Sequence, residues 1–233
     1  MRIDDALETE LVSFTGELLH SHPVLARARR GELSPSVVND YLASILHLLR
    51  STPRLLDKAE RRARERGEAL LAGFFARKAE EERGHEHWAE HDIATLHSAY
   101  GLSPGQPREA VVALVTWLER LVDTDPGSYV GYIFFAEYFT VLAGPECVRT
   151  LTQFCGIPSE ALTAVSRHAD LDRQHVAEAR TDIRRLFEGS ADAEARLLDA
   201  LRASEDYFRE FLDDLERSAA AAEAGCSAPS LRN

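Results

Sequence analysis

The sequence predicts an all-helical protein with a single domain, and three observations support this prediction. Apolar residues recur every three or four positions along nearly the whole chain, as they do on one face of an α-helix. Breaks in this period coincide with prolines, glycines and serines that start or stop helices. No segment alternates apolar and polar residues between turns, as a half-buried strand would. At 233 residues the chain is long enough for one large domain and short for two.

Each expected helix is placed by its apolar period and its boundary residues. The Ser34-Pro35 pair is a helix cap followed by proline at the first helical position, and Pro53 is expected to begin another helix in the same way. Gly101 ends a long helix, and a cluster of proline, glycine and serine at 102–107 forms a turn. We expect helices, in order, at about 7–21, 35–50, 53–67, 68–100, 109–122, 129–142, 145–154, 159–187 and 191–221.

No repeat and no long linker divides these helices, so residues 1–219 are expected to form one helical domain. The small, polar residues 220–233 are expected to form a flexible tail.

Composition excludes some classes of function. The formal net charge of −12 argues against a nucleic-acid or anionic-membrane surface, because both require a basic footprint. Three cysteines without metal-type spacing fit a reducing compartment. The acidic N-terminus does not resemble a signal peptide, and no segment approaches a membrane span, so we expect a cytoplasmic protein.

The first group of candidate metal ligands lies in EERGHEHW, in the middle of the expected long helix. Glu82 and His85 are three residues apart, so a continuous helix presents them on one side, and Glu81 lies one turn from His85 as well. A carboxylate beside an imidazole is a suitable half-site for Fe(II) or Mn(II). Because the surrounding sequence is highly charged, a solvent-facing stripe is the simpler interpretation of this motif alone.

The second group is the run HADLDRQH. The spacing i, i+4, i+7 stacks His168, Asp172 and His175 on one helix face, and Asp170 points elsewhere. Three potential ligands in a row favour a metal site over an exposed polar face.

The third candidate is Glu137, in the apolar and aromatic segment 129–144, which should be buried. An unpaired carboxylate there would cost several kcal/mol, so it needs a partner. A metal ion is the more economical partner, and the alternative is a salt bridge to a distant base such as Lys78 or Arg50. Together the candidates suit two non-haem irons inside a helix bundle.

The three motifs, in this order, resemble the haem-oxygenase-like di-iron oxidases and oxygenases, over roughly residues 12–186. This family shares its fold with haem oxygenase, thiaminase and pyrroloquinoline-quinone synthase. The resemblance implies a haem-oxygenase-like helical bundle with two Fe ions and O2 as co-substrate. It implies metal ligands at Glu82, His85, Glu137, His168, Asp172 and His175, although Glu81, or Glu80 with His87, could provide the first carboxylate.

The resemblance also implies an oxidoreductase that acts on a small organic substrate in biosynthesis, with an amino-acid-type substrate as our expectation. Family reactions include N-oxygenation, desaturation and C–C cleavage. An electron donor and a homodimer are both compatible with it. Residues on helices flanking the site are expected to contact the substrate: Lys78, Arg50, Tyr132, Tyr138 and His47.

Two alternatives remain open on the sequence alone. One is a haem-binding or haem-degrading protein on the same fold, for which His20, His22 and His47 are candidate haem ligands. The other is a non-catalytic helical binding protein in which Glu137 forms an ordinary buried salt bridge.

Overall fold

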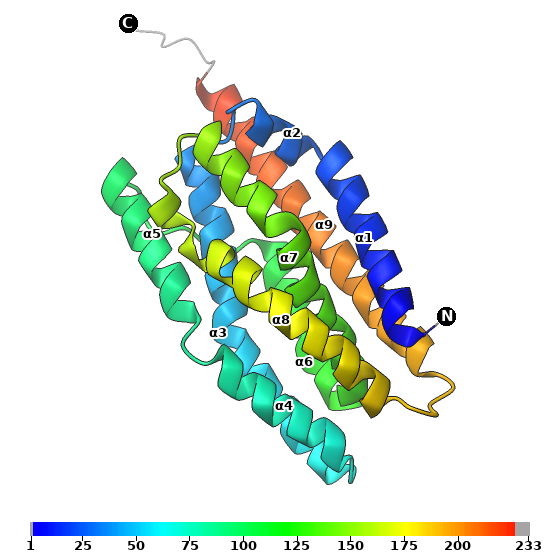
Figure 1. The fold of residues 1–233 in the computed structure, drawn as a ribbon. Helices are drawn as coiled ribbons and strands as arrows, with labels where there is room; N and C mark the ends of the chain where they lie inside the picture. The colour runs from blue at the N-terminus through cyan, green and yellow to red at the C-terminus, as the bar shows by residue number, and fades with distance from the viewer. Residues whose placement is uncertain (1, 227–233) are drawn as a thin grey trace, which may run out of the picture.

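The protein is a bundle of α-helices, seen in a computed structural model that describes residues 2–226, the side chains of 224–226 excepted. No strand occurs within this part of the chain. Figure 1 labels the α-helices, and two short 3-10 turns lie at Pro126–Ser128 and Ser159–Ala161. The helices are α1 (Ile3–Ser21), α2 (Pro23–Arg29), α3 (Pro35–Glu65), α4 (Ala69–Glu82), α5 (Glu86–Tyr100), α6 (Glu109–Thr124), α7 (Tyr129–Gln153), α8 (Thr163–Leu186) and α9 (Ala193–Cys226).

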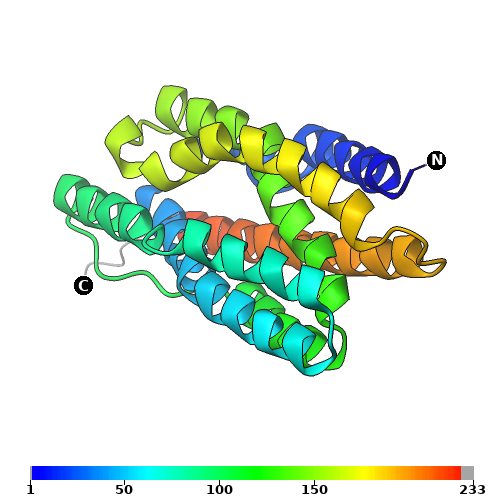
Figure 2. The same cartoon turned by 60° about the horizontal axis from the view of Figure 1, so that its bottom comes forward.

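The helices pack in layers around one apolar core. In Figure 2, α1 and α8 lie on one side, α3 and α4 lie on the other, and α9 runs between them. Helix α7 packs against both α8 and α9. The apolar period that predicts α1 is confirmed, because Leu7, Leu11 and Leu18 are fully buried in this core.

Two expected helix starts at prolines are wrong. Helix α3 continues through Pro53, and α7 continues through Pro145. Proline removes one hydrogen bond inside a helix. Packing of the helix segments before and after the proline against the rest of the protein can outweigh that loss. In α3 the hydroxyls of Ser51 and Thr52 also donate to the carbonyl groups four residues earlier, at 2.8 and 3.0 Å.

The expected helix at 68–100 is also wrong, because it is interrupted after Glu82 and resumes at Glu86. Gly84 has a φ of +92°, a conformation that residues with a Cβ rarely adopt. The chain therefore changes direction in the middle of the first candidate metal motif. Helix α2 was not predicted, and α9 runs to Cys226, beyond the start of the expected tail. Residues 227–233 of that tail lie outside the described residues.

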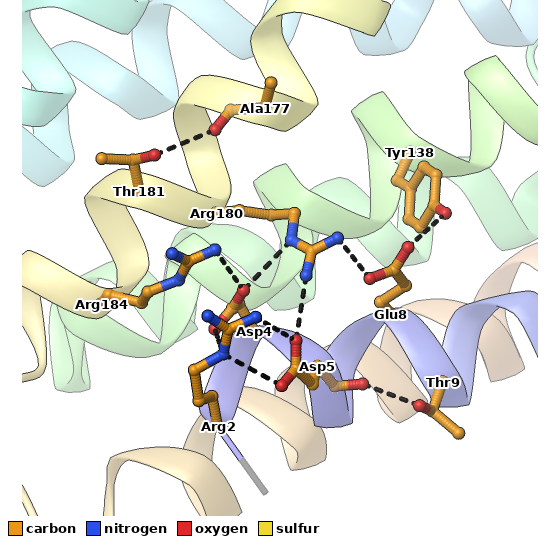
Figure 3. Close-up of polar contacts among 10 residues, drawn as sticks. All are labelled: Arg2, Asp4, Asp5, Glu8, Thr9, Tyr138, Ala177, Arg180, Thr181 and Arg184. Carbon is orange, nitrogen blue, oxygen red and sulfur yellow. Dashed lines mark hydrogen bonds and ion pairs between the residues drawn. The ribbon is translucent and has the colours of Figure 1, made fainter.

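Helix α8 is fastened to the beginning of the chain by ion pairs (Figure 3). The fully buried Asp4 accepts hydrogen bonds from Arg180 at 3.1 Å and Arg184 at 2.8 Å. Arg180 also pairs with Glu8, which accepts a hydrogen bond from the Tyr138 hydroxyl of α7 at 3.0 Å. These contacts hold the C-terminal half of α8 against α1 and α7.

Among the described helices, none is both long and apolar enough to cross a membrane.

Candidate metal centre

Side chains from α4, α7, α8 and the α4–α5 junction meet inside the bundle. They form two groups of potential ligands, and the ligand atoms of each group lie within 4.8 Å of one another. The first group consists of Glu82, His85 and His168. The second consists of Glu82, Glu137 and His175. Glu82 belongs to both, so we describe the two groups as one cage with a shared carboxylate.

The interruption between α4 and α5 places His85. Its ring stacks on Trp88 with centroids 4.1 Å apart, and it meets the His168 ring edge-on at 4.9 Å. Its Nδ1 lies 3.3 Å from Oε2 of Glu82. Glu82 and His85 thus remain neighbours, although one continuous helix does not carry them. Burial alone would raise the pKa of Glu82, but contact with His85 and the nearby positive charges hold it below its usual value.

The position of His168 is set by the start of α8. Asp92 of α5 accepts hydrogen bonds from Oγ1 of Thr163 at 2.5 Å and from the backbone nitrogen of Ala164 at 2.7 Å. The carbonyl of Ala164 accepts a 2.7 Å hydrogen bond from Nδ1 of His168. Because a carbonyl only accepts, Nδ1 carries the proton and Nε2 keeps its lone pair.

The first group fits a transition-metal ion. Within the described residues, Nε2 of His168 is buried without a hydrogen-bond partner, and Nδ1 of His85 is buried with only the Glu82 carboxylate beside it, at 3.3 Å. Unpaired buried polar atoms are costly, and a metal ion would complete both. One carboxylate with two imidazoles is also a ligand set that iron binds in oxygen-activating sites.

The second group already holds a cation. The side chain of Lys78 is 2% exposed, and its Nζ lies 2.8 Å from Oε1 of Glu137 and 3.0 Å from Oε2 of Glu81. This is the salt bridge that the sequence left as the alternative partner of Glu137. Burial raises the pKa of Glu137 to about 7, against the opposing effect of Lys78. Burial lowers the pKa of Lys78, but the two carboxylates outweigh it and raise the value, so Lys78 is positively charged at neutral pH.

Asp172, which was also expected to be a metal ligand, belongs to neither group and contacts His175 instead. Its side chain is 2% exposed, and its Oδ1 accepts a hydrogen bond of 3.1 Å from Nδ1 of His175. This leaves Nε2 of His175 with the lone pair. Burial raises the pKa of Asp172, against the effect of His175 and His168. Asp170 is exposed on the other side of the helix, as the helical period predicts.

The three neighbouring carboxylates of α4, on Glu80, Glu81 and Glu82, have different partners in the structure. Glu82 belongs to both ligand groups, whereas Glu81 pairs with Lys78 and Arg77. Glu80 pairs with Arg83 at 2.6 Å. His87 is exposed and pairs with Glu90, so the Glu80 and His87 alternative does not form a site.

A cavity of about 240 Å³ opens beside the cage. At one end it is lined by Lys78, Glu82, Glu137, His168 and Asp172. The remaining wall is mostly apolar and comes from helices that are distant in sequence, with Val37, Ile45, Leu48, Phe139, Phe208 and Leu212 among its residues. The sequence could not predict this wall, since it depends on how side chains of different helices leave space between them.

Of the five residues expected to contact the substrate, two line the cavity and three do not. Lys78 and Tyr132 line the cavity. Arg50 is on the surface and pairs with Glu90 at 2.8 Å, and the hydroxyl of Tyr138 donates to Glu8. His47 is half-buried outside the cavity wall, and burial lowers its pKa.

Residues that would support other chemistry are poorly placed for it. His20 is exposed, and His22 caps α2 through Nδ1 while its Nε2 lies 3.2 Å from Asp213. Neither these histidines nor His47 line the cavity beside the cage. Cys147 does line it, but burial raises the pKa of its thiol to about 11, which leaves little thiolate to act as a nucleophile.

Comparison with known proteins shows which solved structures share this fold. No protein-family profile and no curated protein sequence matches the chain. Solved structures do match. A domain of unknown function with a heme oxygenase-like fold from Shewanella denitrificans has a TM-score of 0.78 at 18% identity, covering 97% of this chain and 96% of its own.

Two further structures are similar. A CADD-like protein of unknown function from Nostoc punctiforme has a TM-score of 0.68 at 17% identity, covering 91% of this chain and 97% of its own. A TenA homologue from Pseudomonas syringae has a TM-score of 0.68 at 18% identity, covering 91% of both chains. The chain therefore has the heme oxygenase-like fold that its sequence predicts.

Proposed function

We propose that this protein is a non-haem iron oxidase or oxygenase that activates O2 to oxidise a small organic substrate. The observation that carries the proposal is the pair of buried imidazole nitrogens, on His85 and His168, that lie together with the Glu82 carboxylate beside an apolar cavity. The expectation of two irons corresponds to the two ligand groups that share Glu82.

Each part of the site has a task in this reaction. Glu82, His85 and His168 would hold Fe(II), which supplies electrons and open coordination positions for O2. The Ala164 carbonyl keeps the proton of the neutral His168 ring on Nδ1, so that Nε2 presents its lone pair to the metal. The apolar cavity wall keeps bulk water away from the site and binds the substrate beside it.

The cavity supports a substrate with an apolar body. Lys78 is engaged by Glu81 and Glu137, and Arg50 lies on the surface, so neither is a free clamp for a substrate carboxylate. An amino-acid-type substrate therefore needs an apolar side chain to fill the cavity and pack against the wall formed by α3, α7 and α9. An external electron donor and a homodimer remain part of the proposal.

The decisive experiment is anaerobic loading with Fe(II), followed by exposure to O2. We expect stoichiometric iron binding, O2 consumption and a transient visible absorption. His85→Ala should abolish all three. His87→Ala is the matched control, because this exposed histidine two residues away is outside the cage, and it should behave like the wild type.

The two alternatives predict different results. A haem protein would develop a Soret band when haem is added. A non-catalytic binding protein with a structural salt bridge at Glu137 would bind no iron at all, and this outcome would refute the proposed function.

A further inference from the structure

The two halves of the cage differ in one respect: the second half contains a positively charged side chain. Nζ of Lys78 lies 2.8 Å from Oε1 of Glu137, which is one of the three residues of the second ligand group. The charge of Lys78 also acts on Glu82 and on His175, the other two. An ammonium group thus interacts with every residue that a second metal ion would need.

The chain is built to keep Lys78 in this place. It lies on α4 one turn before Glu82, and its side chain is among the largest that are fully buried in the described residues. Glu81 holds the ammonium from a second direction at 3.0 Å. A lysine that could leave for solvent would show an exposed nitrogen, whereas the Nζ of Lys78 is inaccessible. Its neighbour Arg77 points outward and pairs with Asp182 on α8.

A divalent ion and this ammonium would compete for the same carboxylate. Both are cations that bind Glu137, and at distances of a few ångströms in a buried site their repulsion is weakly screened. In the first group Lys78 acts only on the shared Glu82, and within the described residues no cation contacts the two imidazole nitrogens: Nδ1 of His85 lies beside Glu82, and Nε2 of His168 has no hydrogen-bond partner.

We propose that Lys78 takes the place of the second metal ion, so that the protein binds one transition-metal ion, at Glu82, His85 and His168. This inference rests on the proposed function, since it assumes that the first group binds iron. It replaces the pair of irons expected from the sequence by one ion and one ammonium group. Glu137 and His175 then surround a fixed positive charge beside the metal instead of a second metal.

The test is the number of Mn(II) ions bound, with Mn(II) used as an air-stable substitute for Fe(II). Equilibrium dialysis with metal analysis gives the stoichiometry, and electron paramagnetic resonance separates an isolated Mn(II) from a coupled pair. We expect one isolated ion in the wild type. Lys78→Met, which keeps much of the side-chain volume and removes the charge, should bind two ions that are magnetically coupled.

Two further variants serve as controls. Lys78→Met combined with Glu137→Gln should return to one ion, because the second group then lacks its carboxylate. Arg77→Met removes the neighbouring cation on the outer face of the same helix and should keep the wild-type stoichiometry. Circular dichroism melting checks that each variant folds, and the wild-type result does not depend on any variant.

The outcomes separate this inference from the proposed function. Two Mn(II) ions on the wild type would overturn the inference and leave the proposed function intact. One ion on both the wild type and a folded Lys78→Met variant would also overturn it, because the lysine would not be what excludes the second ion. No ion on any variant would overturn the proposed function together with the inference.

Discussion

Asp92 is predicted to stabilise the protein and to keep the metal site in shape, although it is not a ligand. Its side chain is fully buried and binds Thr163 and the backbone nitrogen of Ala164 at the start of α8. Hydrogen bonds to a charged group contribute about 1.5–3 kcal/mol each. Removing the carboxylate also removes its own desolvation cost, which offsets part of this. We therefore expect Asp92→Ala to lower the free energy of unfolding by about 2–3 kcal/mol.

Thermal and urea unfolding of the metal-free protein measure this loss. For a chain of this size it corresponds to a fall in Tm of roughly 4–12 °C. Asp92→Asn keeps one acceptor oxygen and should lose less. Mn(II) affinity should also fall, by at most about tenfold, since Asp92 acts on His168 only through Ala164. A loss of stability below about 0.5 kcal/mol for Asp92→Ala would refute this account of the α8 start.

Two other predictions concern single carboxylates. Burial raises the pKa of Glu205 on α9 to about 8, so the cost of ionising this carboxyl in the folded protein is absent below pH 4.5, grows between pH 4.5 and 8, and is constant above pH 8. Glu205→Gln should therefore leave Tm unchanged near pH 4.5 and raise stability at pH 9. The full shift corresponds to nearly 5 kcal/mol, but Glu205 is 6% exposed and local opening that lets water reach its carboxylate reduces the expected gain to about 1–2 kcal/mol. A gain that is equal at both pH values would contradict this. In the Lys78→Met background, Asp172→Asn should weaken binding of the second Mn(II) about 10- to 100-fold by releasing His175, while Asp170→Asn should not change it; equal effects in dialysis would mean that the α8 register is misread.

The sequence predicted the helical fold well because helical periodicity is a local property. It misjudged Pro53 and Pro145, since the cost of a proline inside a helix is local but the packing that outweighs it is not. It also missed the interruption between α4 and α5, although Gly84 inside the motif was a visible signal. Glycine is tolerated in helices often enough that this signal alone does not decide.

The sequence named five residues that the structure brings together as potential ligands, but it did not show which partner the buried Glu137 has. The i, i+4, i+7 spacing brought His168 and His175 to one face, and the apolar surroundings of Glu137 correctly indicated a buried partner. Whether that partner is a metal ion or Lys78 depends on how α4 packs beside α7 and α8. Lys78 lies three residues before Glu81 and four before Glu82, so its proximity to α4 carboxylates was visible, but its contact with Glu137 was not.

The ion pairs between Asp4 and the arginines of α8 have a consequence for how the protein is made. They join residues 176 and 180 positions apart, so a ribosome completes α1 long before the segment that binds it. At about 5–20 residues per second, this interval lasts roughly 10–35 seconds. During that time the apolar face formed by Leu7, Leu11 and Leu18 has neither α8 nor α9 to cover it. This face of α1 is therefore exposed until those helices are made, and the candidate metal site can form only after α8, with His168 and His175, has left the ribosome.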